Sequence, residues 1–288
     1  MSPVLVKDVM VRDVAYVSIP GNRDEVLKTL QTRRVSGVPV VKKGVVVGMI
    51  TRNDLLRNRE EDQTALLMSR DPIVVSPESD IKEASRLLLK HGIRRLPVVE
   101  DGKLVGIITI ADIVRVAADL NIPADIEPYF EKEISVLWSE MPLVVAGAIM
   151  EYASAAACPV IDSGLTLVGI ISDRDLIKAS VIEESVEKTD MSADAGEDTW
   201  MWDRVMQTMN RYYAVSRIKL RDIKVGEAMV PAMTAIKSSN VSESAGIMSK
   251  NKIDQMPVVT SAQKLMGLLR DRDIVLALID YYEQGEAY

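Results

Sequence analysis

Residues Gly106–Val114 read GIITIADIV, a short apolar strand that turns directly into a helix. Close copies of this stretch are GMITRNDLL from Gly48, GIISDRDLI from Gly169 and GLLRDRDIV from Gly267. Each copy carries an aspartate six residues after its glycine, and roughly sixty residues separate the first three copies. Self-similarity at a nearly fixed period indicates a chain built from copies of one structural unit.

A second marker keeps the same rhythm one strand earlier in each copy. It is a proline inside an apolar run, and the four runs are VPVV (38–41), LPVV (96–99), CPVI (158–161) and MPVV (256–259). Two markers that move together are far harder to obtain by chance than one. The sequence therefore predicts four repeats of one unit.

The second repeat gives the clearest view of this unit. IVVSPESD predicts an extended lead, and IKEASRLLLKHG predicts a helix that is capped by Ser79 or Asp80 and stops at Gly92. The runs RRLPVVE and KLVGIIT flank the turn at Asp101 and Gly102 and predict a β-hairpin, which the helix ADIVRVAADL follows. Each repeat is thus a β-α-β-β-α unit, and the fold class is α/β.

Such a unit leaves one apolar face of its sheet without a partner. We therefore expect the first repeat to pair with the second, and the third with the fourth. The predicted boundaries of the four repeats are 1–60, 61–120, 121–182 and 223–288, with an insert at 183–222 before the fourth repeat.

The third repeat departs from the pattern at its start. PYF from Pro128 stands where the first repeat has DVM from Asp8, and the helical stretch MPLVVAGAIMEYASAAA is almost entirely apolar. A helix that is apolar all round is typical of burial on most sides. We therefore expect this helix to be buried, at a seam between the two halves of the protein.

The insert has two parts of different character. It begins with the acidic, polar stretch EESVEKTDMSADAGEDT, which predicts a loop or a weakly ordered linker. WMWDRVMQTMNRYYAVSR, from Trp200 to Arg217, then predicts a helix with an apolar stripe of Trp202, Val205, Met206, Met209 and Tyr213. This stripe either packs on its own domain or docks a partner.

Composition narrows the class of protein. A formal net charge of −7 and a pI near 5.0 argue against a surface that binds nucleic acid or anionic lipid throughout. The lone Cys158, flanked by apolar residues, predicts a buried small side chain, with no disulfide and no cysteine-rich metal site. The start MSPVLVKDVMVRDV carries charges where a signal peptide needs its apolar core, and no run is long enough for a membrane span. We expect a cytoplasmic protein.

The repeated turn itself allows two interpretations. Its hydroxyl residue occupies a helix N-cap position and its aspartate lies in the first helical turn, which is the arrangement of a capping box. The recurrence of Asp, in place of the longer Glu or Gln, favours a further role. A short carboxylate beside backbone N–H groups can accept hydrogen bonds from a ribose diol, while the helix N-terminus favours a phosphate.

The four repeats resemble CBS domains, in which the turn glycine, two apolar residues, Ser or Thr, two variable residues and Asp form the nucleotide-binding signature. The resemblance covers nearly the whole chain except the insert, and it implies two Bateman modules, each with two clefts for an adenosine compound. It implies ribose contacts for three hydroxyl–aspartate pairs: Thr51 with Asp54, Thr109 with Asp112, and Ser172 with Asp175. In the fourth turn Asp273 remains but Arg270 replaces the hydroxyl, so that cleft is doubtful or rebuilt around phosphate.

Four such repeats in one chain are most similar to the γ subunit of AMP-activated protein kinase and its prokaryotic relatives. IRRLPVV in the second repeat is similar to that family's basic dyad, which implies phosphate contacts for Arg94 and Arg95. Since adjacent strand residues point to opposite faces, at least one of the two can reach a cleft. The other candidate phosphate ligands lie inside the turns and are Arg52, Arg174, Arg270 and Arg272. His91 is expected to end a helix.

These observations predict a regulatory module that binds AMP, ADP or ATP and transmits occupancy to a protein partner or a second copy. The alternatives are a regulator that binds S-adenosylmethionine and a regulator associated with DNA. The acidic start of the insert argues against the second, because a DNA-binding helix-turn-helix is basic. No set of nucleophile, base and orienting residue, no P-loop and no metal-ligand cluster is recognisable, so we expect no catalytic residues and no metal.

Overall fold

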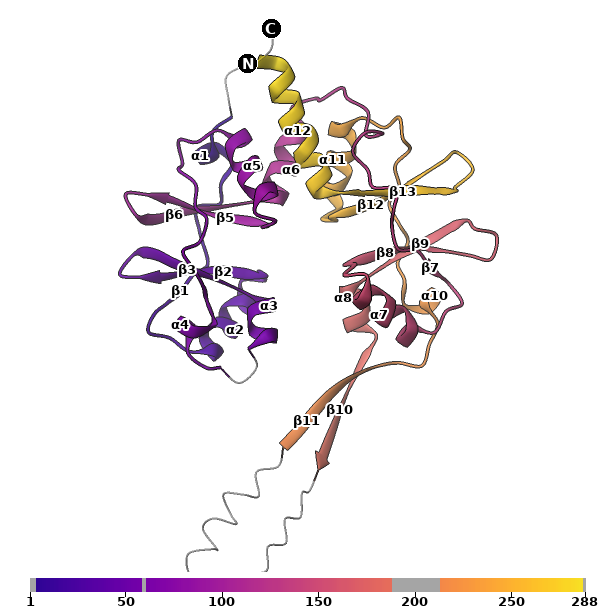
Figure 1. Cartoon of the computed structure of the whole chain (residues 1–288), viewed down its shortest axis with the longest axis horizontal. Helices are drawn as coiled ribbons and strands as arrows, with labels where there is room; N and C mark the ends of the chain where they lie inside the picture. The colour runs from indigo at the N-terminus through magenta and orange to yellow at the C-terminus, as the bar shows by residue number, and fades with distance from the viewer. Residues whose placement is uncertain (1–3, 59–60, 188–212, 287–288) are drawn as a thin grey trace, which may run out of the picture. The chain divides into compact units, whose positions relative to one another are not determined.

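The computed structural model describes residues 4–58, 61–187 and 213–286. The chain divides into two compact units (Figure 1). The first unit contains Met1–Lys132, Met233–Ala262 and Met266–Tyr288, and the second contains Glu133–Ala232 and Gln263–Leu265. The first unit therefore holds the first two repeats and most of the fourth, and the second unit holds the body of the third.

The first two repeats follow the predicted order of lead, helix, hairpin and helix. The first repeat comprises α1 (Val6–Val9), β1 (Val17–Ser18), α2 (Arg23–Thr32), β2 (Gly37–Lys42), β3 (Val45–Thr51) and α3 (Arg52–Arg57). The second comprises α4 (Thr64–Leu67), β4 (Ser69–Arg70), α5 (Ile81–Lys90), β5 (Arg95–Glu100), β6 (Lys103–Thr109) and α6 (Ile110–Asp119).

The third and fourth repeats follow the same order, with a two-stranded ribbon between them. The third comprises β7 (Leu137–Trp138), α7 (Leu143–Tyr152), β8 (Ala157–Ile161), β9 (Leu167–Ser172) and α8 (Asp173–Lys178). The ribbon is β10 (Ser180–Glu187) and β11 (Tyr213–Leu220). The fourth comprises α10 (Val225–Ala228), α11 (Val241–Asn251), β12 (Gln255–Val259), β13 (Leu265–Arg270) and α12 (Asp271–Glu286).

Local signals place the helix and hairpin of the second repeat as predicted. The Asp80 side chain, rather than Ser79, caps α5 by accepting a hydrogen bond from the backbone N–H of Glu83. The helix ends at His91, the C-cap, and Gly92 follows with a φ of +61°, the left-handed conformation that glycine adopts without strain. Asp101 and Gly102 both have positive φ, as a tight turn between β5 and β6 requires.

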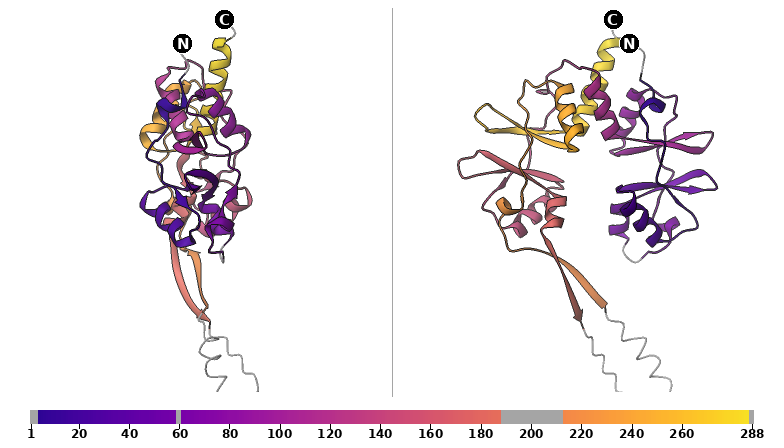
Figure 2. Two further views of the ribbon diagram at one scale, coloured as in Figure 1. Left: turned by 90° about the vertical axis from the view of Figure 1, so that its left-hand side faces the viewer. Right: turned by 180° about the vertical axis from the view of Figure 1, so that it is seen from behind.

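One mixed sheet joins the first two repeats. Its strand order is β1-β2-β3-β6-β5, with β4 paired on β3. The two hairpins meet where Val45 of β3 pairs with Lys103 of β6, and they lie side by side in Figure 1 and Figure 2. This pair joins the first residues of the two strands, so one sheet runs through both hairpins.

The leads of paired repeats cross over to the partner's hairpin. Val11, in the lead of the first repeat, exchanges two backbone hydrogen bonds of 2.9 Å with Ile107 of β6, and β4 of the second repeat returns the exchange by pairing with β3. The bridges Glu131–Leu268 and Ile170–Val230 repeat this exchange between the third and fourth repeats. The predicted pairing of first with second and third with fourth is confirmed.

The crossover explains the glycine that opens each turn. A Cβ on Gly106 would lie 2.4 Å from the sulfur of Met10, which belongs to the DVM stretch of the partner repeat. A Cβ on Gly267 would lie 2.5 Å from the ring of Phe130, which belongs to the PYF stretch that replaces DVM. Phe130 is 5% exposed. The altered start of the third repeat therefore keeps the same packing role with a different side chain.

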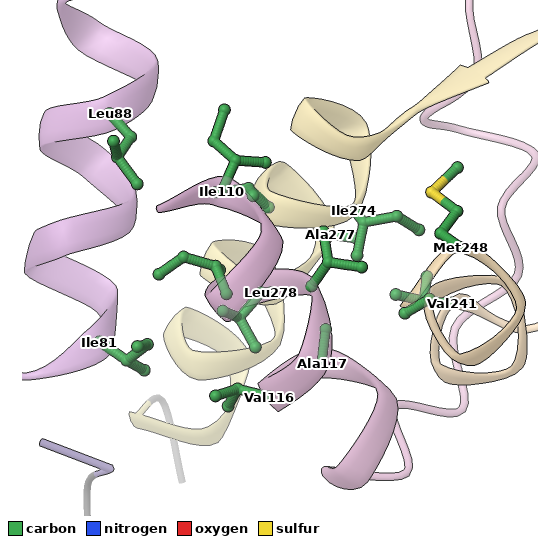
Figure 3. Close-up of a cluster of buried hydrophobic side chains, with 14 of the residues drawn as sticks. Ile81, Leu88, Ile110, Val116, Ala117, Val241, Met248, Ile274, Ala277 and Leu278 are labelled. Carbon is green, nitrogen blue, oxygen red and sulfur yellow. The ribbon is translucent and has the colours of Figure 1, made fainter. Parts of the chain in front are cut away.

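The second and fourth repeats share one apolar core in the first unit. Helices α5 and α6 pack against α11 and α12, and Figure 3 shows the side chains that meet there. They include the fully or almost fully buried Ile81, Leu88, Ile110, Val241, Met248, Ile274 and Leu278. Burying a side chain of this size stabilises a fold by roughly 1.5–3 kcal/mol, so the start of α12 is held firmly against the second repeat.

The helix of the third repeat is less buried than its composition predicts. Leu143, Ala146 and Met150 of α7 are buried, whereas Val144, Val145 and Tyr152 are 55%, 46% and 89% exposed. The prediction of burial on most sides is therefore wrong. Apolar composition shows only that a helix tolerates burial, while the sheet of a repeat covers one side of it.

The insert also differs from the prediction where the structure describes it. Residues 183–187, expected in a loop, belong to β10, and residues 213–217, expected in a helix, belong to β11. The rest of the expected loop and helix lies outside the described residues. The two strands pair antiparallel, with Glu183 opposite Arg217 and Ile182 opposite Ile218.

Two further expectations concern membranes and the cysteine. In the described part of the chain, helices that combine the length and the apolarity of a membrane span are absent. Cys158 of β8 is buried as a free thiol, and burial raises the pKa of this thiol to about 11. The predicted role of Cys158 as a small apolar side chain is confirmed.

Candidate functional site

A cavity of about 570 Å³ lies between the first two repeats. Two segments of the first repeat form one side of it, and the end of β6 with the first turn of α6 forms the other. The lining residues are Val11, Asp13, Val14, Ala15, Arg33, Arg34, Val35, Ser36, Gly37, Arg94, Arg95, Ile107, Thr109, Ile110, Ala111 and Asp112. This volume suits a ligand of small-molecule size. We call it the first cleft.

One wall of the first cleft is apolar. Val11 and Ile107, joined by the crossover pairing, lie beside Val14, Ala15 and Ile110. Ligand sites usually combine such a wall, which buries an apolar or aromatic part of the ligand, with a few placed polar groups. The first cleft therefore has a surface on which a planar base can lie.

The turn that begins α6 also supplies polar groups to the first cleft. Thr109 donates its backbone N–H and its hydroxyl to Asp112 Oδ2, over 2.9 and 2.7 Å. The second carboxylate oxygen, Oδ1, pairs with the exposed Arg115 at 2.9 Å. Asp112 is therefore first of all a helix cap, as the capping-box interpretation requires. A ribose diol would reach its carboxylate by competing with the solvent-exposed Arg115.

Arg95 places a positive charge inside the first cleft. Its Nη2 donates to the Ser36 hydroxyl over 2.5 Å, and its Nη1 is buried without a hydrogen-bond partner among the described residues. Burial, followed by the charges of Arg94 and Arg52, lowers the pKa of Arg95. A buried guanidinium without a facing carboxylate is costly unless an anion joins it. Arg95 is therefore a candidate anion-binding group of the first cleft.

Gly37 makes room for this guanidinium. A Cβ at this position would lie 2.0 Å from Arg95 Nη1, closer than two atoms can approach without one of them moving. Gly37 of the first repeat and Arg95 of the second are equivalent positions, because each lies two residues before the proline of its repeat. The missing side chain in one repeat thus accommodates the long side chain of the other.

Arg94 lines the first cleft but is paired outside it. Its Nη2 lies 2.6 Å from Asp271 Oδ2 and 3.4 Å from Asp254 Oδ2, and both carboxylates belong to the fourth repeat. The two residues of the dyad therefore face different neighbours, as the alternation of side chains along a strand leads one to expect.

Two arginines of the first cleft were missed by the sequence reasoning. Arg33, at the C-cap of α2, pairs with Asp13 at 2.6 Å, and Arg34 follows with a φ of +53°. In the second repeat the residue aligned with Arg34 is Gly92, the usual residue for a left-handed helix stop. A bulky arginine at a position that favours glycine was the signal available in the sequence.

The other turns of the first three repeats keep the capping geometry away from this cleft. Asp54 Oδ2 accepts the backbone N–H and hydroxyl of Thr51 over 2.7 and 2.6 Å, and Asp175 Oδ2 accepts those of Ser172 over 3.0 and 2.6 Å. Arg52 donates to the backbone carbonyl of Val35 at 3.3 Å. Arg174 is exposed on α8 of the second unit.

In the turn of the fourth repeat, the charged side chains pair with one another and with Glu131. Asp273 Oδ2 accepts the backbone N–H of Arg270 over 2.7 Å, without the hydroxyl that the other turns provide. The guanidinium of Arg270 pairs with Glu131, and that of Arg272 lies 3.6 Å from the same carboxylate. Burial raises the pKa of Asp273 to about 6, against the backbone hydrogen bond and the two arginines, which lower it.

No group of three or more His, Cys, Asp or Glu side chains is positioned to hold a metal ion in the described ranges. The polar groups of the first cleft are arginines, one hydroxyl–aspartate turn and the start of α6, a helix of ten residues. This set suits an anionic organic ligand.

Comparison with known proteins agrees with the repeat structure. The CBS domain profile matches residues 6–61, 64–119, 126–182 and 225–280. A CBS domain-containing protein of Bacillus subtilis is 36% identical over 114 residues, which are 38% of this chain and 81% of that protein.

Two solved structures match almost the whole chain. An uncharacterized conserved protein from Pyrococcus horikoshii has a TM-score of 0.68 at 27% identity, over 96% of this chain and 100% of that one. A protein from Methanocaldococcus jannaschii, described as a candidate archaeal homologue of γ-AMPK, has a TM-score of 0.66 at 22% identity with the same coverage. The second likeness concerns the fold alone.

Proposed function

The chain belongs to the CBS domain family, and we propose that it is a regulatory module that binds an adenine nucleotide, AMP, ADP or ATP, in the first cleft. One observation carries the proposal. Arg95 lines the cleft with a half-buried guanidinium, whose Nη1 is unpaired among the described side chains, and the cleft also has a helix N-terminus and an apolar wall. These groups match the phosphate, the ribose and the base of a nucleotide.

Each part of the ligand has a separate physical partner. The base lies on the wall of Val11 and Ile107, and the ribose hydroxyls donate to Asp112. The phosphate accepts hydrogen bonds from Arg95, because charge-assisted contacts of guanidinium with phosphate are about twice as strong as neutral hydrogen bonds. The N-terminus of α6 adds a further attraction for negative charge.

The alternative ligand S-adenosylmethionine fits this cleft less well. Its sulfonium carries a positive charge close to the ribose, and in the first cleft that charge would lie near Arg95 and Arg34. Two like charges at close range in a partly buried site repel strongly. A nucleotide, whose phosphate is negative, gains from the same arginines.

A regulatory role follows from the way the cleft is built. Its walls come from two repeats, so an occupant bridges them and favours the arrangement in which both contact it. The polar groups that line it, arginines beside one hydroxyl–aspartate turn, are suited to holding an anionic ligand in place. We propose that occupancy is read by a protein partner or a second copy of the chain.

Thermal unfolding with AMP, ADP, ATP, S-adenosylmethionine and a DNA duplex tests the proposed function. A nucleotide at one hundred times its dissociation constant should stabilise the protein by about 2.7 kcal/mol. Stabilisation by S-adenosylmethionine or DNA without any by the three nucleotides would contradict the proposal. Release of phosphate or ADP during prolonged incubation with ATP would contradict the regulatory assignment.

A further inference from the structure

Arg94 stands between two sets of negative groups. On one side it lines the first cleft next to Arg95, and on the other it pairs with Asp271 and Asp254 of the fourth repeat. Its side chain is 54% exposed, so it can reorient into solvent-accessible space once its ion pairs break. When an arginine can pair with either a bound anion or a protein carboxylate, the two compete for it.

Asp271 is the fixed member of this arrangement. Its side chain is only 7% exposed, its backbone N–H donates to the Asp254 carbonyl over 2.9 Å, and its Oδ1 accepts the backbone N–H of Arg272. It begins α12, and the apolar core of the second and fourth repeats holds that helix through residues such as Ile274 and Leu278. Asp271 therefore stays in place while Arg94 can move.

Asp271 and Arg94 also differ in how much separating their ion pair costs each of them. Burial raises the pKa of Asp271, and the charge of Arg94 opposes this rise. Arg94 by contrast is half in solvent and keeps its hydration when it turns away. The pair consequently keeps the Arg94 guanidinium on Asp271 until a stronger anion, next to Arg95, competes for it.

We propose that Asp271 of the fourth repeat is a specificity-determining residue for the first cleft, although it lies outside that cleft. By retaining Arg94, it lowers the affinity of the cleft for phosphate-bearing ligands and leaves the affinity for the nucleoside unchanged. The proposal rests on the proposed function for its adenine ligand, but the competition for Arg94 applies to any anion bound beside Arg95.

The variant Asp271→Asn tests the proposal by isothermal titration with AMP, adenosine and inorganic tripolyphosphate. Asparagine keeps an acceptor for the Arg272 N–H and removes the charge that holds Arg94. We expect AMP and tripolyphosphate to bind about threefold to tenfold more tightly, because a second guanidinium becomes available to the phosphate, and adenosine to bind unchanged. Unchanged or weaker binding of both anions would overturn the proposal.

Two further variants separate this effect from loss of packing. In an Arg94→Gln background, Asp271→Asn should give no gain, and a gain there would overturn the proposal because it could not come from Arg94. Glu283→Gln is the matched control, since it breaks the 2.5 Å ion pair between Arg86 of α5 and Glu283 of α12, which joins the same two repeats away from the cleft. It should leave every affinity unchanged, and a gain equal to that of Asp271→Asn would also overturn the proposal.

The three ligands distinguish failure of this inference from failure of the proposed function. If tripolyphosphate binds more tightly to Asp271→Asn while neither AMP nor adenosine binds, Asp271 has its proposed role and the adenine ligand is wrong. If AMP binds the wild type and the substitution has no effect on AMP or tripolyphosphate, the proposed function stands and the role of Asp271 is wrong. If no anion binds either protein, both proposals fail.

Discussion

The second and fourth repeats begin their last helix with the same backbone turn but surround it with different side chains. In the second repeat a threonine and an aspartate share hydrogen bonds at the edge of a cleft that a half-buried arginine also lines. In the fourth an arginine replaces the threonine, and Glu131 pairs with both arginines of the turn. The shared part, the aspartate that accepts a backbone N–H, is structural, and only the surroundings decide whether the turn can receive a ligand.

The largest expected difference between the two turns is in nucleotide affinity. Arg95→Gln should weaken AMP binding about tenfold to a hundredfold, because a hydrogen bond to a charged group contributes roughly 1.5–3 kcal/mol. Arg270→Gln should change it little, since Arg270 is engaged with Glu131. Calorimetric titration of both variants measures their affinities for AMP and, as a control, for adenosine. Equal weakening of AMP binding by the two substitutions would remove the distinction between the turns.

The turns should also differ in how stability depends on pH. The folded-state pKa of Asp273 is about 6, above its ordinary value of 3.8, and burial is the main cause. A carboxyl with a raised folded pKa favours the folded state below pH 3.8, and this contribution is lost as the pH rises through 6. After a discount for partial exposure, the loss should be about 1–2 kcal/mol.

Asp273→Asn removes this titration. Denaturant unfolding should therefore show the variant gaining stability relative to the wild type between pH 4 and pH 7, with no further gain at pH 8. The neighbours of the carboxyl, Arg270, Arg272 and Glu131, are unchanged in the variant, so the comparison isolates one group. A stability difference that is constant from pH 4 to pH 8 would show that burial does not shift this pKa.

Removing each aspartate entirely should sharpen the comparison further. Asp112→Ala loses the acceptor of the Thr109 N–H and hydroxyl and should cost about 1 kcal/mol of stability at pH 7, together with several-fold weaker AMP binding. Asp273→Ala should cost less at the same pH, because it also relieves the burial of a charge, and should leave AMP binding unchanged. If Asp112→Ala lost much stability but kept full AMP affinity, capping of α6 would be the only role of Asp112.

The smallest effect concerns the orientation of Arg95. Ser36→Ala removes the 2.5 Å hydrogen bond to Arg95 Nη2 without changing the volume of the first cleft appreciably. The loss of one hydrogen bond should weaken AMP binding by about 0.5–1 kcal/mol, or twofold to fivefold. The measurement is again a titration, with adenosine as the control ligand. A weakening as large as that of Arg95→Gln would mean that Ser36 itself contacts the phosphate.

The four-repeat fold could be predicted because its signals are local and occur several times. The glycine, proline and turn residues fix the ends of strands and helices, and α5 runs from its Asp80 cap to Gly92 as the sequence indicates. The apolar helix α7 misled the prediction, because composition says which side chains tolerate burial and not which neighbours arrive to bury them.

The candidate site could be predicted only in part, for a related reason. Thr109, Asp112 and the Arg94–Arg95 dyad are visible as motifs, and the structure brings them into one cleft. The separation of the dyad depends on Asp271, which arrives through the packing of α12. The placement of Arg33 and Arg34 depends on how the first repeat folds onto the second. Such contacts join residues far apart in the chain, and no local pattern specifies them.

A structure of the protein with bound AMP tests the central proposal most directly. The proposal predicts a phosphate oxygen of AMP within about 3 Å of a guanidinium nitrogen of Arg95, the ribose hydroxyls on Asp112 and the base against Val11 and Ile107. AMP bound elsewhere, or bound in the first cleft with its phosphate turned away from Arg95, would contradict it.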